Sequence, residues 1–165
     1  GADDDFDAQR LEVEFEPLEL PGRPPLWEEE ILSNPDWVEA LPGYGTVGDY
    51  YVNIDYAELI EDYEYEDAIR VVLEFTNNSS EEISLSWALS YNAYQNGIEM
   101  ELTYPNADWE TEVDYMQDEY VRPGETITVA LCYALRNQQS PVEFEILDYW
   151  SGDALGVEYE LVWGD

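Results

Sequence analysis

The stretch that decides the fold is EFTNNSSEEISLSWALS, residues 74–90. At its centre, Asn77-Asn78-Ser79-Ser80 separates two apolar runs. Asn77 and Asn78 each begin an Asn-x-Ser pattern, which is the acceptor motif for N-linked glycans. Turns also favour these residues, because asparagine tolerates a left-handed backbone and its side chain mimics a backbone turn. We therefore interpret residues 77–82 as the connection between two core strands and not as a modification site.

The residues on either side of this connection alternate between apolar and polar side chains, which is the period of a strand with one buried face. Before the connection, the apolar positions are Ile69, Val71, Leu73 and Phe75, with Val72 as an exception. After it, they are Ile83, Leu85, Trp87, Leu89 and Tyr91. This alternation predicts one strand over 68–76 and a second over 83–91, with Trp87 in the core.

The same period recurs along most of the chain. It predicts further strands at 49–60, 98–102, 127–135, 142–146 and 157–163, the last with Trp163 in the core. Asn96-Gly97 is typical of a tight hairpin, and Pro123-Gly124 of a turn. Residues 103–119 read as a long polar loop or a short helix. About seven short strands with turns between them predict an all-β fold, a two-sheet antiparallel sandwich.

The chain before this region has a different composition. Six of its nine prolines lie before residue 47, and four aspartates lie within residues 1–7. Within this part, Leu11, Val13 and Phe15 predict one strand, and the residues before Pro35 predict one or two helical turns. We therefore divide the chain into an acidic, proline-rich arm at 1–46 and a sandwich domain at 47–165.

Charge limits the possible partners. The chain has 40 acidic residues, 5 arginines, no lysine and no histidine, for a formal charge of −35. Such a chain repels nucleic acids and anionic lipid surfaces, so neither is an expected partner. Much of this charge is explained by solvated outer faces of the strands. A cationic partner, such as Ca²⁺ or a basic protein, is the alternative explanation.

Few side chains suit catalysis. Without histidine or lysine there is no Ser-His or Cys-His pair, no Schiff base and no P-loop. Cys132, the only cysteine, alternates with Leu131 and Tyr133 and reads as a packed strand residue. Among 40 carboxylates, close pairs arise by chance. The acidic tail lacks the spacing of a calcium loop. We expect no enzyme, no cofactor and no metal site.

Aromatic residues offer the one candidate site. Trp109 lies in the polar segment TYPNADWETEVDYMQDEY, together with Tyr104, Asp108 and Tyr115. Exposed rings beside aspartate and asparagine are typical of surfaces that bind sugars, so these four residues are the candidate ligand-binding set. In the alternative that we favour, Trp109 folds back and covers an open edge of the sandwich.

Four short motifs follow one another between residues 48 and 162. They are Phe75-Thr76-Asn77-Asn78-Ser79, Gln95-Asn96-Gly97, Pro123-Gly124 and Ser140-Pro141-Val142. Their order and spacing resemble a family of secreted lipoproteins of Gram-positive bacteria, whose domain of unknown function is grouped with immunoglobulin-like sandwiches. The resemblance implies a leader and a lipid-bearing cysteine upstream of Gly1, with the arm as a tether. It implies no catalytic residues.

The sequence thus predicts an immunoglobulin-like antiparallel β-sandwich with an N-terminal arm. The expected function is that of an extracellular, lipid-anchored, non-enzymatic surface module that contacts the membrane only through its anchor. Its partner is a cationic protein or a glycan. The alternatives are a carbohydrate-binding module centred on Trp109 and a purely structural spacer.

Overall fold

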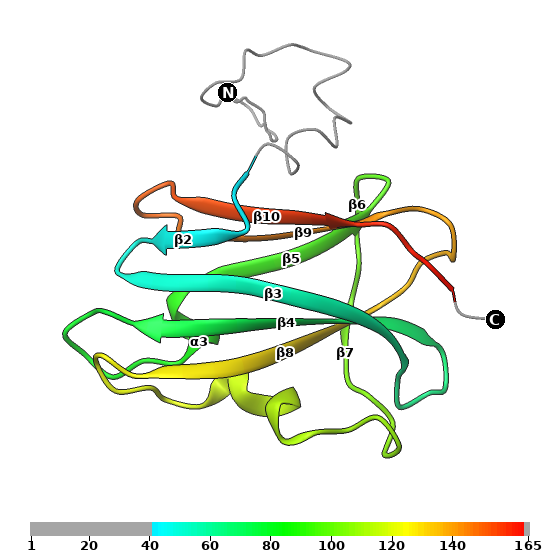
Figure 1. Cartoon of the computed structure of the whole chain (residues 1–165), viewed down its shortest axis with the longest axis horizontal. Helices are drawn as coiled ribbons and strands as arrows, with labels where there is room; N and C mark the ends of the chain where they lie inside the picture. Colours follow the sequence, from blue (N-terminus) through cyan, green and yellow to red (C-terminus); the bar gives the residue numbers. More distant parts are fainter. Residues whose placement is uncertain (1–40, 164–165) are drawn as a thin grey trace, which may run out of the picture. The chain divides into compact units, whose positions relative to one another are not determined.

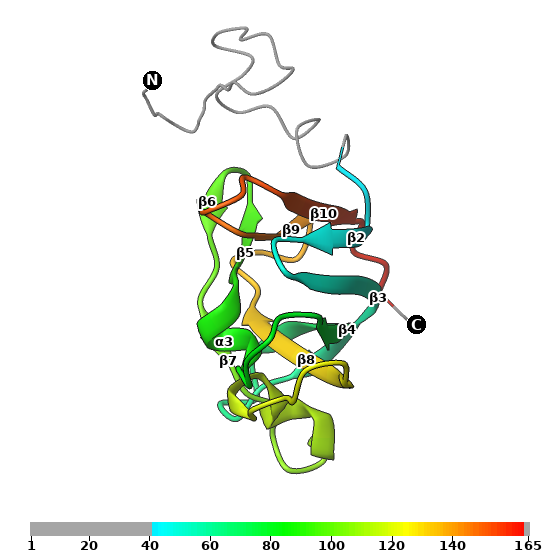
Figure 2. The same cartoon turned by 90° about the vertical axis from the view of Figure 1, so that its left-hand side faces the viewer.

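Two antiparallel sheets form the domain in our computed structural model, which describes residues 41–163 (Figures 1 and 2). The five-stranded sheet has the order β2-β3-β4-β8-β7. Its strands are β2 (Tyr44–Val47), β3 (Tyr50–Glu61), β4 (Asp67–Asn77), β8 (Thr126–Ala134) and β7 (Leu102–Thr103). The four-stranded sheet has the order β10-β9-β5-β6. Its strands are β10 (Ala154–Tyr159), β9 (Val142–Leu147), β5 (Ser90–Gln95) and β6 (Ile98–Glu99). The predicted all-β sandwich is confirmed.

The predicted strand at Leu11–Phe15 and the helical turns before Pro35 lie outside the described residues. Strand β2 spans the boundary that we placed between residues 46 and 47.

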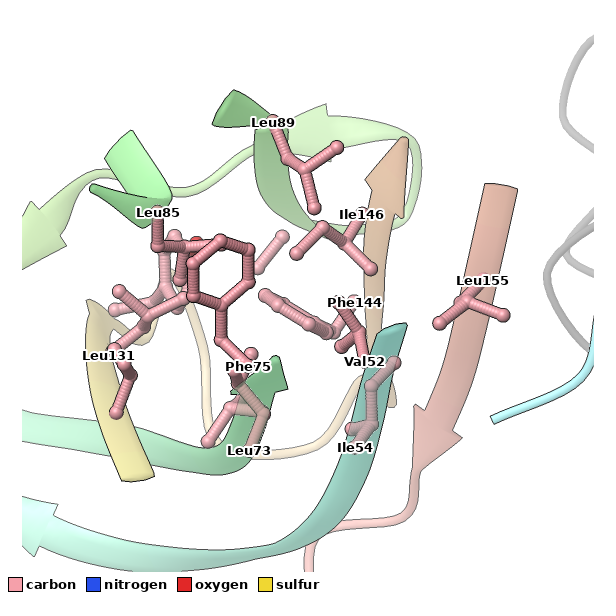
Figure 3. Packing of buried hydrophobic residues seen from close by; sticks show 14 of the residues in the cluster. Val52, Ile54, Leu73, Phe75, Leu85, Leu89, Leu131, Phe144, Ile146 and Leu155 are labelled. Carbon is pink, nitrogen blue, oxygen red and sulfur yellow. The ribbon is translucent and has the colours of Figure 1, made fainter. Parts of the chain in front are cut away.

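The core lies between the two sheets (Figure 3). From β4, Leu73 and Phe75 point inward and are fully buried. From β9 of the other sheet, Phe144 and Ile146 meet them, and the Phe144 ring lies 6.0 Å from the ring of Tyr133 on β8. The predicted alternation in β4, β8 and β9 is therefore confirmed on the inner face.

The outer face of the five-stranded sheet is also covered at one place. The 3₁₀ helix η1 (Glu112–Asp118) packs against β8. On this side Ile60, Ala68 and Cys132 form a small second cluster of buried side chains. Strand β4 is buried on both faces here, so every residue from 69 to 73 is buried. This explains Val72, which did not fit the alternation.

The strand predicted over 83–91 is wrong in its first half. Leu85–Ala88 forms a single helical turn, α3, and only from Ser90 does the chain enter β5. Leu85 and Leu89 both reach the core, since residues four apart share a face in a helix as well as in a strand. Trp87 points outward and is 77% exposed, so its predicted place in the core is wrong. The turn carries the chain from one sheet to the other.

The strand predicted over 157–163 is displaced toward the N-terminus. Strand β10 ends at Tyr159, which pairs with Val142, the first residue of β9. Beyond Tyr159 the neighbouring strand offers no further partner for the ladder. Trp163 is therefore outside the core and 40% exposed, contrary to the prediction.

The turns follow the predicted chemistry. Asn96 and Gly97 both have positive φ, at 53° and 78°, and join β5 to β6. Gly124 has a φ of 88° in the turn before β8. Asn77 accepts a hydrogen bond from the Ser79 amide at 2.9 Å, which is the side-chain turn expected of asparagine.

Asn77 is a buried structural residue, and its replacement is expected to be costly. Its Nδ2 donates to the carbonyl oxygens of Val121 and Glu81, each at 2.8 Å. Asn77→Ala should lower the free energy of unfolding by about 1–3 kcal/mol, because it removes these bonds from a buried position. Asn78 is exposed, so Asn78→Ala should change it by less than about 0.5 kcal/mol. Urea unfolding of both variants tests this, and equal losses would contradict it.

Candidate functional site

A groove of about 670 Å³ lies along one edge of the five-stranded sheet. One wall is the second half of β3, and the other is formed by residues 159–163 at and beyond the end of β10. Its aromatic residues are Trp109, Tyr159 and Trp163. Its carboxylates are Glu58, Glu61, Asp67 and Glu160. Because it combines apolar rings with negative charge, we take it as the candidate functional site.

The groove follows an unpaired edge of β3. Strand β4 pairs with β3 from end to end, whereas on the opposite side β2 covers only Tyr50–Asn53. The Ile54 amide then donates to the carbonyl of Gly43 at 2.9 Å, and the register shifts between Ile54 and Tyr56. From Tyr56 to Ile60, no strand among residues 41–163 pairs with this side of β3. Such irregularities bend a strand at the edge of a sheet.

Buried Arg70 on β4 fixes the loop that carries Trp109. Its Nη1 donates to the Trp109 carbonyl at 2.8 Å and to Asp114 Oδ2 at 2.9 Å. Its Nε donates to Glu58 Oε2 at 2.9 Å. Burial disfavours the charge of Arg70, but Glu58 and Asp114 outweigh burial and raise its pKa. Asp114 also accepts from the Thr111 amide at 2.7 Å, which closes a capping box at the start of η1.

Trp163 is held on the other wall. Its indole Nε1 donates to the Gln138 carbonyl at 2.9 Å, and the Gln138 side chain in turn donates to Asp67. These bonds tie the segment after β10 to the loop between β8 and β9. Trp109 and Trp163 thus line the groove from separate parts of the chain, and each keeps 40% of its surface exposed.

The four predicted site residues fall in two places. Tyr104 and Tyr115 stack on each other, with ring centroids 5.3 Å apart and planes at 15°, and both stay partly exposed. A hydrogen bond to Glu110, followed by burial, raises the pKa of Tyr115 to about 12. Trp109 lies in the groove, beside the open edge of β3. The Asp108 amide donates to Asn106, which shapes the loop before Trp109.

Cys132 is a packed residue, as predicted. It is buried on the outer face of β8, where its thiol lies 3.7 Å from Asp114 Oδ1. Burial, and then the negative charge of Asp114, raises the pKa of the thiol to about 12. The thiol therefore stays protonated, and this is the opposite of what a nucleophilic cysteine needs.

Sequence reasoning did not identify Arg70, Tyr159, Glu160 or Trp163 as site residues. One feature of the sequence indicated Arg70, since it is a cation within the apolar run 68–73, two residues before the irregular Val72. No feature of the sequence indicated Tyr159, Glu160 or Trp163, because their role depends on where β10 ends. Across the described part of the chain, no helix is long and apolar enough to span a bilayer. Within residues 41–163, no group of three or more Asp, Glu or Cys side chains is arranged to hold a metal ion.

Glu145 lies on the outer face of the four-stranded sheet, opposite to Phe144 and Ile146. Burial raises its pKa to about 7 from the ordinary 4.5; a hydrogen bond from Tyr94 opposes this shift and the charge of Glu99 adds to it. Because the pKa of Glu145 is higher in the folded protein, the free energy of unfolding is highest below 4.5, the pKa in the unfolded chain. It falls as the pH rises from there through about 7, the pKa in the folded protein.

We expect Glu145→Gln, which mimics the neutral acid, to match the wild type near about pH 4 and to be the more stable protein near about pH 8. Glu143 and Glu158 occupy neighbouring positions in both proteins, so their effect cancels in the comparison. Unfolding by urea at a series of pH values measures the difference. Glu82→Gln, at an exposed position, is the control, and a difference that does not depend on pH would refute the prediction.

The fold is shared with known proteins. Residues 43–148 match the model of a family described as a domain of unknown function, DUF5067. The structure is similar to the yjhA protein from Bacillus subtilis, with 12% identity, a TM-score of 0.53, and coverage of 72% of this chain and 96% of that one. A protein from Enterococcus faecalis gives 20% identity, a TM-score of 0.52, and coverage of 73% and 90%. An uncharacterized β-sandwich protein from Clostridium difficile 630 gives 15% identity and a TM-score of 0.49, and the match covers 72% of this chain and 91% of that one.

At these identities the structural similarities establish the fold alone. A comparison with curated proteins finds no match. The family model covers well over half of the chain, including β3, β4 and β8, which build the sheet beside the groove. The chain therefore belongs to the DUF5067 family, whose function is unknown.

Proposed function

We propose that this protein is a non-enzymatic binding module, displayed outside a Gram-positive cell, and that the groove beside β3 is its binding site. The observation that carries this proposal is the groove itself. Hydrogen bonds hold the backbone of Trp109 and the indole of Trp163 there, yet each of these residues remains 40% exposed. Rigid, half-exposed rings lose little conformational freedom when a ligand binds, which favours affinity.

The chemistry of the groove suits binding better than catalysis. Its polar groups are carboxylates, and neither histidine nor lysine occurs anywhere in the chain. Aromatic rings and carboxylates hold a ligand by stacking, hydrogen bonds and charge, without a nucleophile. The groove is also open to solvent, whereas catalytic sites gain from the exclusion of water.

The location outside the cell rests on two supports. The motifs at Asn77, Asn96-Gly97, Pro123-Gly124 and Ser140-Pro141 resemble lipoproteins of Gram-positive bacteria. The structures from Bacillus subtilis and Enterococcus faecalis, to which this fold is similar, also come from Gram-positive bacteria.

Surface display is tested with the full-length gene expressed in a Gram-positive host. We expect palmitate labelling of the membrane-bound protein and its removal from intact cells by added protease. Substitution of the lipid-bearing cysteine should abolish the labelling and release the protein into the medium. Protection from protease in intact cells, together with cleavage after lysis, would contradict the proposed location.

A second candidate function is carbohydrate binding at the Tyr104–Tyr115 pair. The two stacked rings are 39% and 45% exposed, and stacked rings beside polar groups offer flat faces to sugars. A glycan array compares the wild type with Tyr104→Ala, Tyr115→Ala and Trp109→Ala. Loss of glycan binding in the two tyrosine variants would favour this candidate, and an array without signal would exclude it.

A further inference from the structure

We propose that the groove binds an extended, basic segment of another polypeptide, which adds as a new strand to the open edge of β3. The inference rests on the proposed function, because it names the ligand class of the same site. Three features of the groove carry it: an unpaired main-chain edge, an excess of negative charge and two exposed indole rings.

The main chain of β3 is the first feature. Ala57 and Leu59 face the core and Glu58 and Ile60 face the opposite side, yet all four line the groove. The edge of the strand therefore lies along the groove itself. An exposed edge presents amide and carbonyl groups in the spacing of a strand, and extended peptides bind such edges by completing the ladder. The open stretch from Tyr56 to Ile60 is long enough for one short added strand.

Charge selects the kind of strand. The groove is lined by four carboxylates and by no arginine. Arg70 is the nearest buried cation on the outer face, and it is already paired with Glu58 and Asp114. With a formal charge of −35, the whole chain attracts basic segments and repels acidic ones. Edge pairing between two copies of this chain is disfavoured for the same reason, so the partner is a different, basic polypeptide.

The aromatic residues complete the match. Trp109 and Trp163 both line the groove, and an indole ring is the aromatic group that attracts ammonium and guanidinium groups best. A strand points alternate side chains to opposite faces. A bound segment can therefore place every second lysine or arginine against the rings and carboxylates while its backbone pairs with β3.

The first test uses the full chain and a peptide of alternating lysine and valine, titrated by calorimetry. We expect saturable binding that weakens at least tenfold between low and physiological salt, because exposed charges are screened. A peptide of alternating glutamate and valine should not bind. Strand addition also predicts that N-methylation of one alternate set of peptide amides abolishes binding, while methylation of the other set is tolerated.

Variants locate the site. Glu61→Gln combined with Glu160→Gln should weaken binding about tenfold, whereas Glu82→Gln combined with Glu125→Gln, which removes the same charge elsewhere, should weaken it less than about threefold. Trp163→Ala should weaken binding about tenfold, and Trp150→Ala, at a 97% exposed tryptophan outside the groove, should not. Equal effects of site and control variants would overturn the inference, since binding would then be a property of net charge.

The outcomes separate the two proposals. If the protein is displayed on the cell but the two sets of methylated peptides bind with equal affinity, strand addition is wrong and the proposal of a surface binding module remains. If the basic peptide does not bind at all, the inference fails irrespective of location. If the protein is protected inside the cell, the proposed function fails irrespective of the titrations.

Discussion

Replacement of Arg70 by methionine is expected to lower the free energy of unfolding by about 3–5 kcal/mol, which is the usual effect of breaking a buried ion pair. The Asp114 carboxylate is fully buried and pairs with Arg70 at 2.9 Å. Without the guanidinium, this buried carboxylate loses its ion-pair partner. The Trp109 carbonyl also loses a donor at 2.8 Å, so the loop at the groove should loosen. Urea unfolding and tryptophan fluorescence measure the two effects.

Arg122 offers the matched control, because it is exposed in the turn before β8. Arg122→Met removes the same charge and should change the free energy of unfolding by less than about 0.5 kcal/mol. Arg70→Lys should recover only part of the loss, since an ammonium group cannot bond Glu58, Asp114 and the Trp109 carbonyl in the same fixed geometry. Wild-type stability in Arg70→Met would show that the network on the outer face does not stabilise the domain.

The second large effect is expected from Phe75→Ala, with a loss of about 3–5 kcal/mol in the free energy of unfolding. Phe75 is fully buried at the end of β4, and its ring lies 5.4 Å from the ring of Tyr50 on β3. Phe75 packs among the buried side chains between the sheets (Figure 3). Its removal leaves a cavity, because the surrounding structure relaxes only in part. The measurement is again urea unfolding.

Trp87→Ala provides the informative comparison for Phe75→Ala. The sequence pattern placed both rings in the core, whereas the structure places Trp87 on the surface at 77% exposure. We expect Trp87→Ala to cost less than about 0.5 kcal/mol. A loss as large as that of Phe75→Ala would mean that residues 83–91 form the strand that the alternation predicts and not the turn α3.

The comparison of Trp87 with Phe75 shows how far the sequence determines the fold. Strands such as β4, β8 and β9 were predictable because each turns apolar side chains toward the core at every second position, and the period of two records that burial. The segment at 83–91 has the same period, but apolar residues four apart, such as Leu85 and Leu89, suit a helical turn equally well. Which form occurs depends on the need to cross between the sheets, and no local pattern contains that information.

The candidate site was predictable only in part. Tyr104, Trp109 and Tyr115 were identified from aromatic residues in a polar segment, and two of them do meet. The groove was not predictable, because it depends on three unrelated features. Strand β2 covers only the first part of β3, β10 stops where β9 begins, and Arg70 holds the loop of Trp109 on the outer face of the sheet. Each is a long-range contact that a single sequence does not reveal.

The central claim is that the open edge of β3 is a binding edge for a basic strand, and hydrogen–deuterium exchange tests it most directly. Amide exchange of the full chain is followed with and without the alternating lysine–valine peptide. We predict that binding slows exchange of the Ala57 and Leu59 amides, which lie on the unpaired side of β3, because the amides of Tyr56, Glu58 and Ile60 already point toward β4. Slower exchange confined to the Tyr104–Tyr115 region, or unchanged exchange in β3 at saturating peptide, would contradict the account.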